Sequence, residues 1–165
     1  MIIAENNFRD EEIFQPREIL EKAGIEVKVA STSLKPAKGM LGGTIKPDML
    51  TSDIKINDFD GVVFIGGAGA SQYWNDPIAH RLARETFNTG KIVAAICIAP
   101  ITLAKAGILQ GKRATVWSTE AGQLKVVGQA IYTGKNVEKD GNIITAAGPF
   151  AAREFGDELV KALIY

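Results

Sequence analysis

The chain has 165 residues, of which 46% are hydrophobic and 23% charged, values typical of a globular protein and unlike those of a disordered chain or a fibre. Lysine plus arginine equals aspartate plus glutamate at 19 each, so we expect neither nucleic acid nor an anionic membrane as the main partner. A lone cysteine cannot form an internal disulfide, and the apolar runs are far shorter than a membrane span. We therefore expect a single domain over residues 1–165, located in the cytoplasm.

Short apolar runs alternate with helix-like segments along the chain. Strands are predicted at residues 1–4, 25–30, 62–65, 91–97, 113–117, 130–133, 137–139 and 143–145. Helices are predicted at about 16–23, from Asp76-Pro77 onward, and at 101–106, 120–127 and 150–163, with Asp10 a candidate N-cap before the first. Helices that stop on a glycine just before an apolar segment indicate βαβ units. The predicted fold class is therefore α/β, a doubly wound and mainly parallel sheet.

Two stretches are predicted to be irregular. Residues 31–58 contain two prolines and a glycine-rich turn, and we expect a small hairpin or edge strands there, packed beside the main sheet. Residues 66–71, Gly-Gly-Ala-Gly-Ala-Ser, are expected to form a flexible loop. Asp140-Gly141 is a hairpin turn signal between two short strands.

The sole cysteine, Cys97, stands where a predicted strand meets the helix that follows Pro100. A side chain at such a corner emerges at the carboxyl edge of the sheet, where α/β proteins bind ligands. It also faces the positive end of a helix dipole, which favours a thiolate. The alternative is a buried core cysteine between Ile96 and Ile98, because free cysteines are among the most buried residues.

Two glycines and a carboxylate are expected beside this cysteine. Gly66-Gly67 follows the strand at 62–65, so the N–H groups of Gly67 and Ile98 could form an oxyanion hole. Otherwise the glycines serve a turn that needs a positive φ. Glu12 lies at the same sheet edge and could hydrogen-bond the sulfur or relay a proton. Alternatively, like Asp10 and Glu11, it is a solvated acid of a first helical turn.

Other chemistries lack their residues in this chain. His80, the only histidine, lies in a charged helical segment and is expected at the surface. One histidine and one cysteine cannot by themselves make a metal site, so we expect no metal. No Gly-Lys-Ser/Thr follows the glycine loop, the dinucleotide fingerprint fails at Gln72, and no Gly-x-Ser-x-Gly occurs. We therefore expect no cofactor.

Four blocks in order and spacing resemble the ThiJ/PfpI superfamily, which includes parkinsonism-associated deglycase-type proteins and PfpI-type peptidases. The blocks are Glu11-Glu12-x-x-x-Pro16, Gly66-Gly67, Ala94-Ala95-Ile96-Cys97-x-x-Pro100, and Thr145-x-x-Gly148-Pro149 leading to Glu154-Phe155. The resemblance implies a flavodoxin-like, glutamine-amidotransferase-like three-layer sandwich that forms at least a dimer. It implies Cys97 as a nucleophile on an elbow, Glu12 as its hydrogen-bonded carboxylate, Gly67 and Ile98 as backbone donors, and Gly66, Trp117 and Pro149 as pocket residues.

The chain departs from this pattern at three positions. Ile98 stands where peptidase-type members have histidine, residues 116–119 lack the histidine of deglycase-type members, and Ala147 replaces an arginine. The family's first strand usually has residues before the segment that matches residues 1–4. We expect either a short first strand or a start inside the natural gene. Exposed apolar positions around Tyr73 and Trp74 are a candidate interface.

Four functions remain open at this point. The first is addition of the Cys97 thiolate to a small reactive aldehyde such as methylglyoxal, with Glu12 as proton relay. The second is a redox or stress response through oxidation of Cys97. The third is a cysteine peptidase or amidase, which lacks a base to activate the thiol. The fourth is a vestigial site used for association only.

Overall fold

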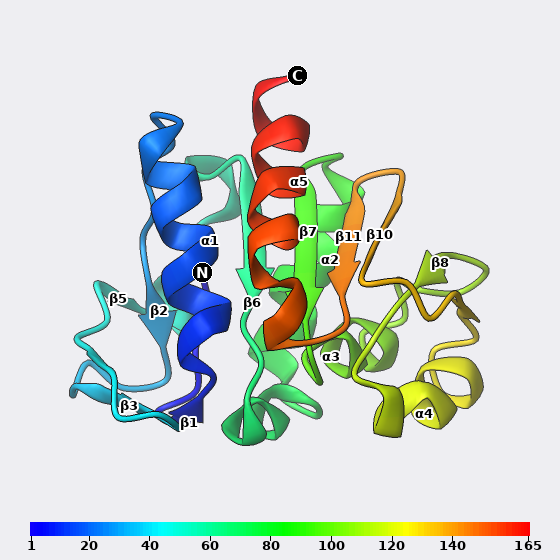
Figure 1. Cartoon of the computed structure of the whole chain (residues 1–165), viewed down its shortest axis with the longest axis horizontal. Coiled ribbons are helices and arrows are strands. Elements are labelled where there is room, and N and C mark those ends of the chain that lie inside the picture. Colours follow the sequence, from blue (N-terminus) through cyan, green and yellow to red (C-terminus); the bar gives the residue numbers. More distant parts are fainter.

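The computed structural model describes residues 1–165 and is built around one twisted sheet (Figure 1). Its central strands lie in the order β10–β11–β7–β6, with β11, β7 and β6 parallel and β10 antiparallel to β11. Isolated bridges from Ile2 to Phe64 and Ala30 extend it towards the parallel pair β2 and β5. The bounds are β2 Ala30–Ser31, β5 Met49–Leu50, β6 Gly61–Phe64, β7 Ile92–Ile96, β10 Val137–Asp140 and β11 Ile143–Ala146.

Both faces of the central strands are buried, as their continuous apolar sequences predict. In β7 the side chains of Val93 and Ala95 enter one core cluster, whereas Ala94 and Ile96 enter the other. This alternation follows from the two-residue period of a strand. The sheet therefore separates two apolar cores, each of which needs a helical layer.

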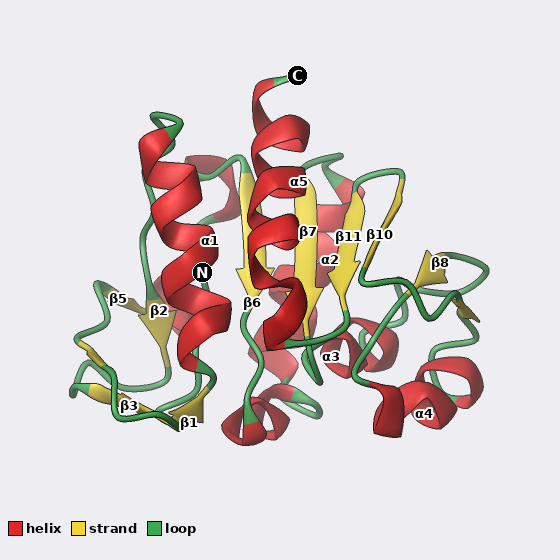
Figure 2. Ribbon diagram, in the orientation of Figure 1, coloured by secondary structure: helices red, strands yellow, loops and turns green.

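Helices supply those layers (Figure 2). The bounds are α1 Asp10–Lys22, α2 Pro77–Asn88, α3 Pro100–Lys105, α4 Ala121–Val126 and α5 Ala152–Ile164. Helices α1 and α5 pack on each other and cover one face, with Ile13, Leu20 and Phe155 in its core, while Leu82 of α2 and Ile101 of α3 enter the opposite core. None of these helices combines the length and apolar character needed to cross a bilayer.

Two small sheets flank the central one. Strands β1 Asn6–Phe8, β3 Ala37–Gly39 and β4 Thr44–Ile45 form one, and the antiparallel β3–β4 pair confirms the hairpin predicted within residues 31–58. Strands β8 Arg113–Ala114 and β9 Ile131–Tyr132 form the other. The expected flexible loop at 66–71 instead enters a 3₁₀ segment, Ala68–Tyr73. Gly141 has a φ of 61° in the predicted β10–β11 turn.

The first helix begins earlier than predicted. It starts at Asp10 with Arg9 as its N-cap, and Pro16 lies inside it rather than in its first turn. Asp10 caps nothing; its carboxylate instead accepts hydrogen bonds from the N–H groups of Leu41 and Gly43, at 2.9 and 2.7 Å. Burial of one helix face therefore outweighs the cost of an interior proline. This correction places Glu12 on a regular helix.

Several predicted strands are shorter in the structure. Of residues 1–4 only Ile2 makes bridges, residues 25–29 form no ladder, and of residues 113–117 only Arg113–Ala114 pairs. The last helix begins at Ala152, after a 3₁₀ turn at Pro149–Ala151. Most apolar residues in these segments are buried although they form few ladder pairs. A run of apolar side chains predicts burial, but it does not determine which strand the segment pairs with.

Candidate active site

Cys97 occupies a sharp corner directly after β7. Its φ is 65°, a left-handed conformation that costs a non-glycine residue roughly 1 kcal/mol or more. The corner is held on both sides: the Cys97 N–H donates to the Ala146 carbonyl at 2.9 Å, and the Cys97 carbonyl accepts from the Trp117 N–H at 2.8 Å. Pro100 then begins α3. The predicted strand-corner-helix arrangement is confirmed.

Glu12 meets Cys97 across Gly66. The side chain of Glu12 projects from the first turns of α1 and is fully buried. A methyl group added at Gly66 would overlap Glu12 Oε1 and lie 2.5 Å from the Cβ of Cys97, so Gly66 is needed here for close approach. Neither carboxylate oxygen has a partner with full hydrogen-bond geometry. The Cys97 thiol and the Gly66 N–H are nevertheless close enough to act on this carboxyl group.

Burial raises the pKa of Glu12 to about 8, against the opposing effects of the Cys97 thiol, the Arg9 charge and the Gly66 N–H. Burial, reinforced by the negative charge of Glu12, also raises the pKa of Cys97 to about 12. The thiol is therefore not activated by its position alone, contrary to the lowered pKa expected from the sequence. Two acids this close titrate as a pair, which loses its first proton near pH 8.

The two predicted backbone donors lie beside the sulfur. The N–H groups of Gly67 and Ile98 both act on Cys97 to lower its pKa, opposing the effect of burial. Gly67 has a φ of 101°, and a side chain there would collide with the backbone of Asn7 and Arg9. The Arg9 N–H fixes the preceding peptide by donating to the Gly66 carbonyl at 3.0 Å. The structure thus brings Cys97, Glu12, Gly66, Gly67 and Ile98 together.

Trp117 and its neighbours form an aromatic rim at the corner. Trp117 is 36% exposed, and its ring lies 6.3 Å from the Phe150 ring, measured between centroids. Gly148 packs against the Trp117 ring so closely that a methyl group there would overlap it. Pro149 follows at once and opens the 3₁₀ turn that precedes α5. The Trp117 backbone therefore contacts the Cys97 corner, and Pro149 directly follows the glycine that packs on the Trp117 ring.

His80 and Tyr73 differ from expectation. His80 is half-buried rather than exposed, and its Nε2 lies 2.7 Å from the Trp74 carbonyl oxygen. Tyr73 is buried, with its hydroxyl donating to the Ile3 carbonyl at 2.7 Å, so it cannot be an exposed interface residue. Trp74 is half-buried and donates from Nε1 to the Ile98 carbonyl at 3.1 Å. The link from Trp74 to the corner was missed, because nothing in the sequence pairs these distant positions.

Arg9 was also missed by sequence reasoning. Its guanidinium makes a two-pronged pair with Glu11, at 2.8 and 3.1 Å, and its charge helps to lower the pKa of Glu12. Its position immediately before α1 became informative only once the helix start was known. No group of three His, Cys, Asp or Glu side chains is placed to hold a metal ion.

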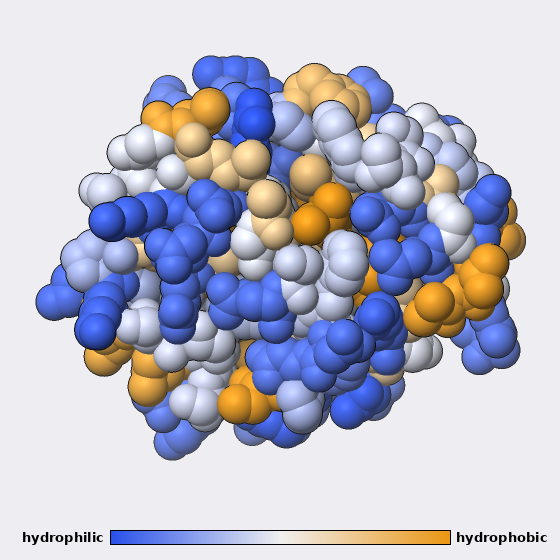
Figure 3. Space-filling view, turned by 90° about the horizontal axis from the view of Figure 1, so that it is seen from below, coloured by the Kyte–Doolittle hydropathy of each residue, from blue (hydrophilic) through white to orange (hydrophobic).

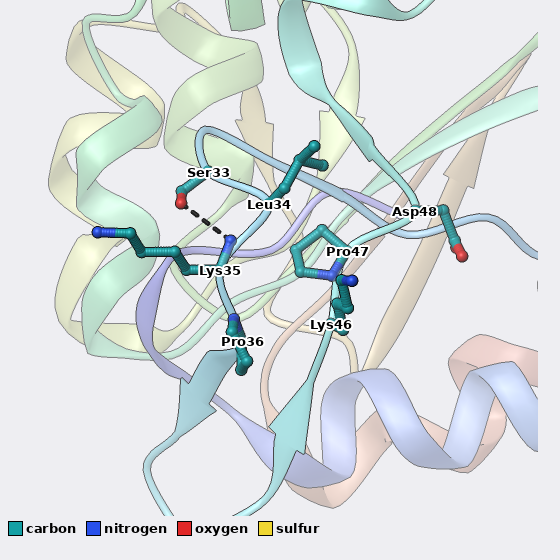
Figure 4. Close-up of a pocket in the computed structure, with 7 residues that line it drawn as sticks. All are labelled: Ser33, Leu34, Lys35, Pro36, Lys46, Pro47 and Asp48. Carbon is teal, nitrogen blue, oxygen red and sulfur yellow. Dashed lines mark hydrogen bonds between the residues drawn. The ribbon is translucent and has the colours of Figure 1, made fainter.

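Open depressions lie elsewhere on the surface. One of about 760 Å³ is lined by Ser33, Leu34, Lys35, Pro36, Lys46, Pro47 and Asp48 (Figure 4). The Lys35 side chain extends away from Pro47, so the polar groups do not converge. Cys97, in contrast, is only 9% exposed. Figure 3 looks onto the edge of the molecule that carries the carboxyl ends of the strands, and its apolar atoms are scattered in several separate places.

Comparisons with known proteins agree with this fold. The model of the DJ-1/PfpI family matches residues 1–162. A glutathione-independent glyoxalase of Caenorhabditis elegans is 30% identical over 92% of this chain and 81% of its own length, and the deglycase PfpI of Pyrococcus furiosus is 29% identical over 99% and 98%. The crystal structure of a ThiJ/PfpI domain protein from Brachyspira murdochii superposes with a TM-score of 0.96, at 36% identity over 98% of this chain and 93% of that one. The predicted flavodoxin-like α/β class is confirmed.

Proposed function

The chain belongs to the DJ-1/PfpI family, and on that premise we propose that it converts small reactive aldehydes, as a glyoxalase- or deglycase-like enzyme, through Cys97. The observation that carries the proposal is the meeting of the Cys97 corner, the buried Glu12 carboxyl and two backbone N–H groups. A thiol, a proton carrier and an oxyanion site are the groups that carbonyl addition requires. The glyoxalase and deglycase names of the relatives support the same substrate class.

The first step starts from the pair with one proton, a Glu12 carboxylate facing the Cys97 thiol. Sulfur attacks the aldehyde carbon, a carbon–sulfur bond forms, and the thiol proton moves to Glu12. The carbonyl electron pair moves onto oxygen, where the N–H groups of Gly67 and Ile98 stabilise the negative charge. Glu12 then returns the proton to that oxygen and leaves a thiohemiacetal, so protons and electrons balance.

With methylglyoxal the thiohemiacetal proceeds to lactate without an external oxidant. The hydrogen on the first carbon leaves as a proton, which Glu12 is placed to accept, and the hydroxyl proton on that carbon moves to the neighbouring ketone oxygen through an enediol. A proton is then added to the second carbon, so that the first carbon becomes a thioester and the neighbouring ketone becomes an alcohol. Water then hydrolyses the thioester and restores the Cys97 thiol. Overall one water is added.

Peptide cleavage is poorly supported by the same corner. An amine leaving group must be protonated, and histidine is the usual residue for this. Ile98 follows Cys97 directly, and the one histidine, His80, is engaged by the Trp74 carbonyl. A peptidase or amidase would have to take its imidazole from another chain. We place this activity below aldehyde conversion.

A second candidate function is oxidation of Cys97 in a redox response. The favouring observation is that neither Glu12 oxygen has a partner with full hydrogen-bond geometry, while burial raises the pKa of this carboxyl to about 8. A protonated Glu12 can therefore donate to an oxygen bound to sulfur, which stabilises a sulfinic acid. Intact mass after mild peroxide should show two added oxygens in wild type. If folded wild type gains no oxygens, or if Cys97→Ser gains the same two oxygens, this candidate function is contradicted.

We further propose a single domain that works in the cytoplasm as a homo-oligomer, at least a dimer. The exposed side chains of Phe14, Met40 and Leu41 support association near the site, because Asp10 ties the β3–β4 hairpin to α1 there. Light scattering on wild type and Leu41→Glu checks it. We expect a dimer or larger species that the charge weakens; a monomeric wild type contradicts it.

The proposed activity is tested by lactate release from methylglyoxal. We expect wild-type protein at micromolar concentration to form lactate and Cys97→Ser to form none, because a serine hydroxyl is far less nucleophilic than a thiol. Glu18→Gln on the exposed face of α1 is a matched control and should retain wild-type turnover. Equal lactate formation by Cys97→Ser, or none by folded wild type, overturns the proposal.

A further inference from the structure

We infer that Trp74 is a positioning residue for Cys97 chemistry: it and His80 hold Ile98 so that its N–H faces the sulfur. The effect of Trp74 on turnover rests on the proposed function, whereas its effect on the reactivity of Cys97 does not. Trp74 lies at the end of the 3₁₀ segment Ala68–Tyr73, far from Cys97 in sequence. Its indole N–H donates a hydrogen bond to the carbonyl of Ile98, one of the predicted site residues.

The peptide groups on either side of Ile98 are both held by hydrogen bonds. The first contains the Cys97 carbonyl and the Ile98 N–H in one plane, and the Trp117 N–H holds that carbonyl at 2.8 Å. The second contains the Ile98 carbonyl, which accepts from the Trp74 indole N–H at 3.1 Å and from the Ile101 N–H at 3.2 Å, while its Ala99 N–H donates to the Ile96 carbonyl at 3.1 Å. Trp74 therefore adds a side-chain restraint to a backbone turn that lies next to the strained φ of Cys97.

His80 in turn holds Trp74. Its Nε2 lies 2.7 Å from the Trp74 carbonyl oxygen, which can only accept, so Nε2 carries the hydrogen. Lys105 of α3 lies with its Nζ 5.9 Å from the centre of the indole ring and also donates to Asn75 at 3.2 Å. Trp74 is therefore held by a hydrogen bond from α2, and Lys105 adds only a cation over its ring. Such a hydrogen-bonded support limits the freedom of an oxyanion donor.

A positioning role predicts a different pattern from a merely structural one. The Ile98 N–H lowers the pKa of Cys97 against the effect of burial. If it turns away, the thiol should ionise at higher pH and the oxyanion should lose a donor. A Trp74 that only fills space would affect thermal stability alone, because a phenyl ring fills much of the same volume. The charged groups facing Cys97 are Glu12 and Arg9, and neither changes in this comparison.

The test compares Trp74→Phe, His80→Leu and His80→Gln with wild type. The first removes the indole N–H, the second removes the support of the Trp74 carbonyl, and the third restores an amide N–H donor. Lys105→Gln is the control, because it loses the cation over the indole but keeps the hydrogen bond to Ile98. Two readouts are used: the pH profile of Cys97 alkylation by iodoacetamide, and kcat and KM for methylglyoxal.

For Trp74→Phe we expect the alkylation midpoint to rise by about half a pH unit and kcat to fall about tenfold with KM nearly unchanged, less than the loss for complete removal of an oxyanion donor. His80→Leu should show the same direction, and His80→Gln and Lys105→Gln should resemble wild type. A folded Trp74→Phe with the wild-type alkylation profile overturns the inference. So does a His80→Gln as impaired as His80→Leu. If wild type makes no lactate, the proposed function fails while the alkylation profile still decides this inference.

Discussion

The Cys97 corner and the open depression between Ser33 and Asp48 are opposites in shape and chemistry. The depression holds about 760 Å³ and two lysines, but its polar groups diverge (Figure 4). The corner is almost closed, with Cys97 only 9% exposed, yet a thiol, a carboxyl and backbone donors converge there. Convergence of groups with altered pKa, rather than open volume, identifies the site in this molecule.

The largest expected effect comes from filling the space between Cys97 and Glu12. Gly66→Ala should destabilise the fold by about 3 kcal/mol and abolish lactate formation, because the new methyl overlaps Glu12, the Cys97 Cβ and the Ile96 carbonyl. Urea unfolding measures this. The matched control is Gly122→Ala in α4, where the added methyl meets nothing within 4 Å and should be neutral or stabilise by up to about 1 kcal/mol. Equal effects of the two alanines would show that the corner is not tightly packed.

Removing the acid of the pair should change the pH profile of the thiol. In wild type we expect Cys97 alkylation to stay slow up to about pH 10, because burial and the Glu12 charge raise the pKa of the thiol to about 12. Glu12→Gln removes that charge, so alkylation should begin at lower pH, whereas lactate formation should fall at least a hundredfold because no group accepts the thiol proton. Alkylation rates measured from about pH 6 to 12 give the midpoint. A wild-type rate that is already flat from pH 6 contradicts the raised pKa of the pair.

Glu12→Gln should also remove part of the pH dependence of the free energy of unfolding. Folded Glu12 keeps its proton to about pH 8, whereas an unfolded glutamate loses it near 4.5, so the folded state binds more protons between these values. Raising the pH through this window should therefore destabilise wild type by up to about 1.4 kcal/mol per pH unit. Glu12→Gln should lack this slope, and Glu18→Gln should keep it. Parallel melting curves for wild type and Glu12→Gln from pH 5 to 8 would exclude a buried, protonated Glu12.

A smaller effect is expected from the cation beside the corner. The Arg9 charge lowers the pKa of Glu12, so Arg9→Gln should move the alkylation midpoint upward by a fraction of a pH unit. Arg17→Gln, which breaks an exposed pair with Glu21 on the same helix, should not move it. A downward shift in Arg9→Gln, or equal shifts in both variants, contradicts the role given to Arg9.

The smallest effect belongs to the open depression. Lys35→Gln and Lys46→Gln, made together, should change neither the alkylation midpoint nor lactate formation, because both lysines are exposed and do not converge. Stability should shift by no more than about 0.5 kcal/mol. A clear loss of activity in this double variant would show that open volume matters after all and would weaken the comparison.

Local sequence signals predicted the corner but not its energetics. A β-branched run ending in a cysteine, a proline three residues later and a Gly-Gly after the neighbouring strand were enough to place Cys97 and Gly67 together. The start of α1 was missed because Pro16 suggested a first turn, whereas packing against α5 tolerates it inside the helix. The raised pKa of Cys97 could not be read from the sequence, because it depends on how completely the packed fold excludes water.

The contact between Trp74 and Ile98 could not be predicted either. It joins a side chain to a backbone carbonyl across 24 positions, and no periodicity or motif encodes such a pair. The same is true of Asp10, whose carboxylate binds two N–H groups of the β3–β4 hairpin instead of capping α1. Polar side chains that serve distant backbone groups are where sequence patterns carry the least information.

The most direct measurement follows methylglyoxal labelled with carbon-13 at its aldehyde carbon by NMR in the presence of the protein. Wild type should show a carbon bonded to sulfur and then labelled lactate, while Cys97→Ser should show neither. Glu12→Gln should show little of either, because no group in the corner accepts the thiol proton. Labelled lactate formed equally by Cys97→Ser, or no sulfur-bonded carbon and no lactate with folded wild type, would contradict addition of this aldehyde at Cys97.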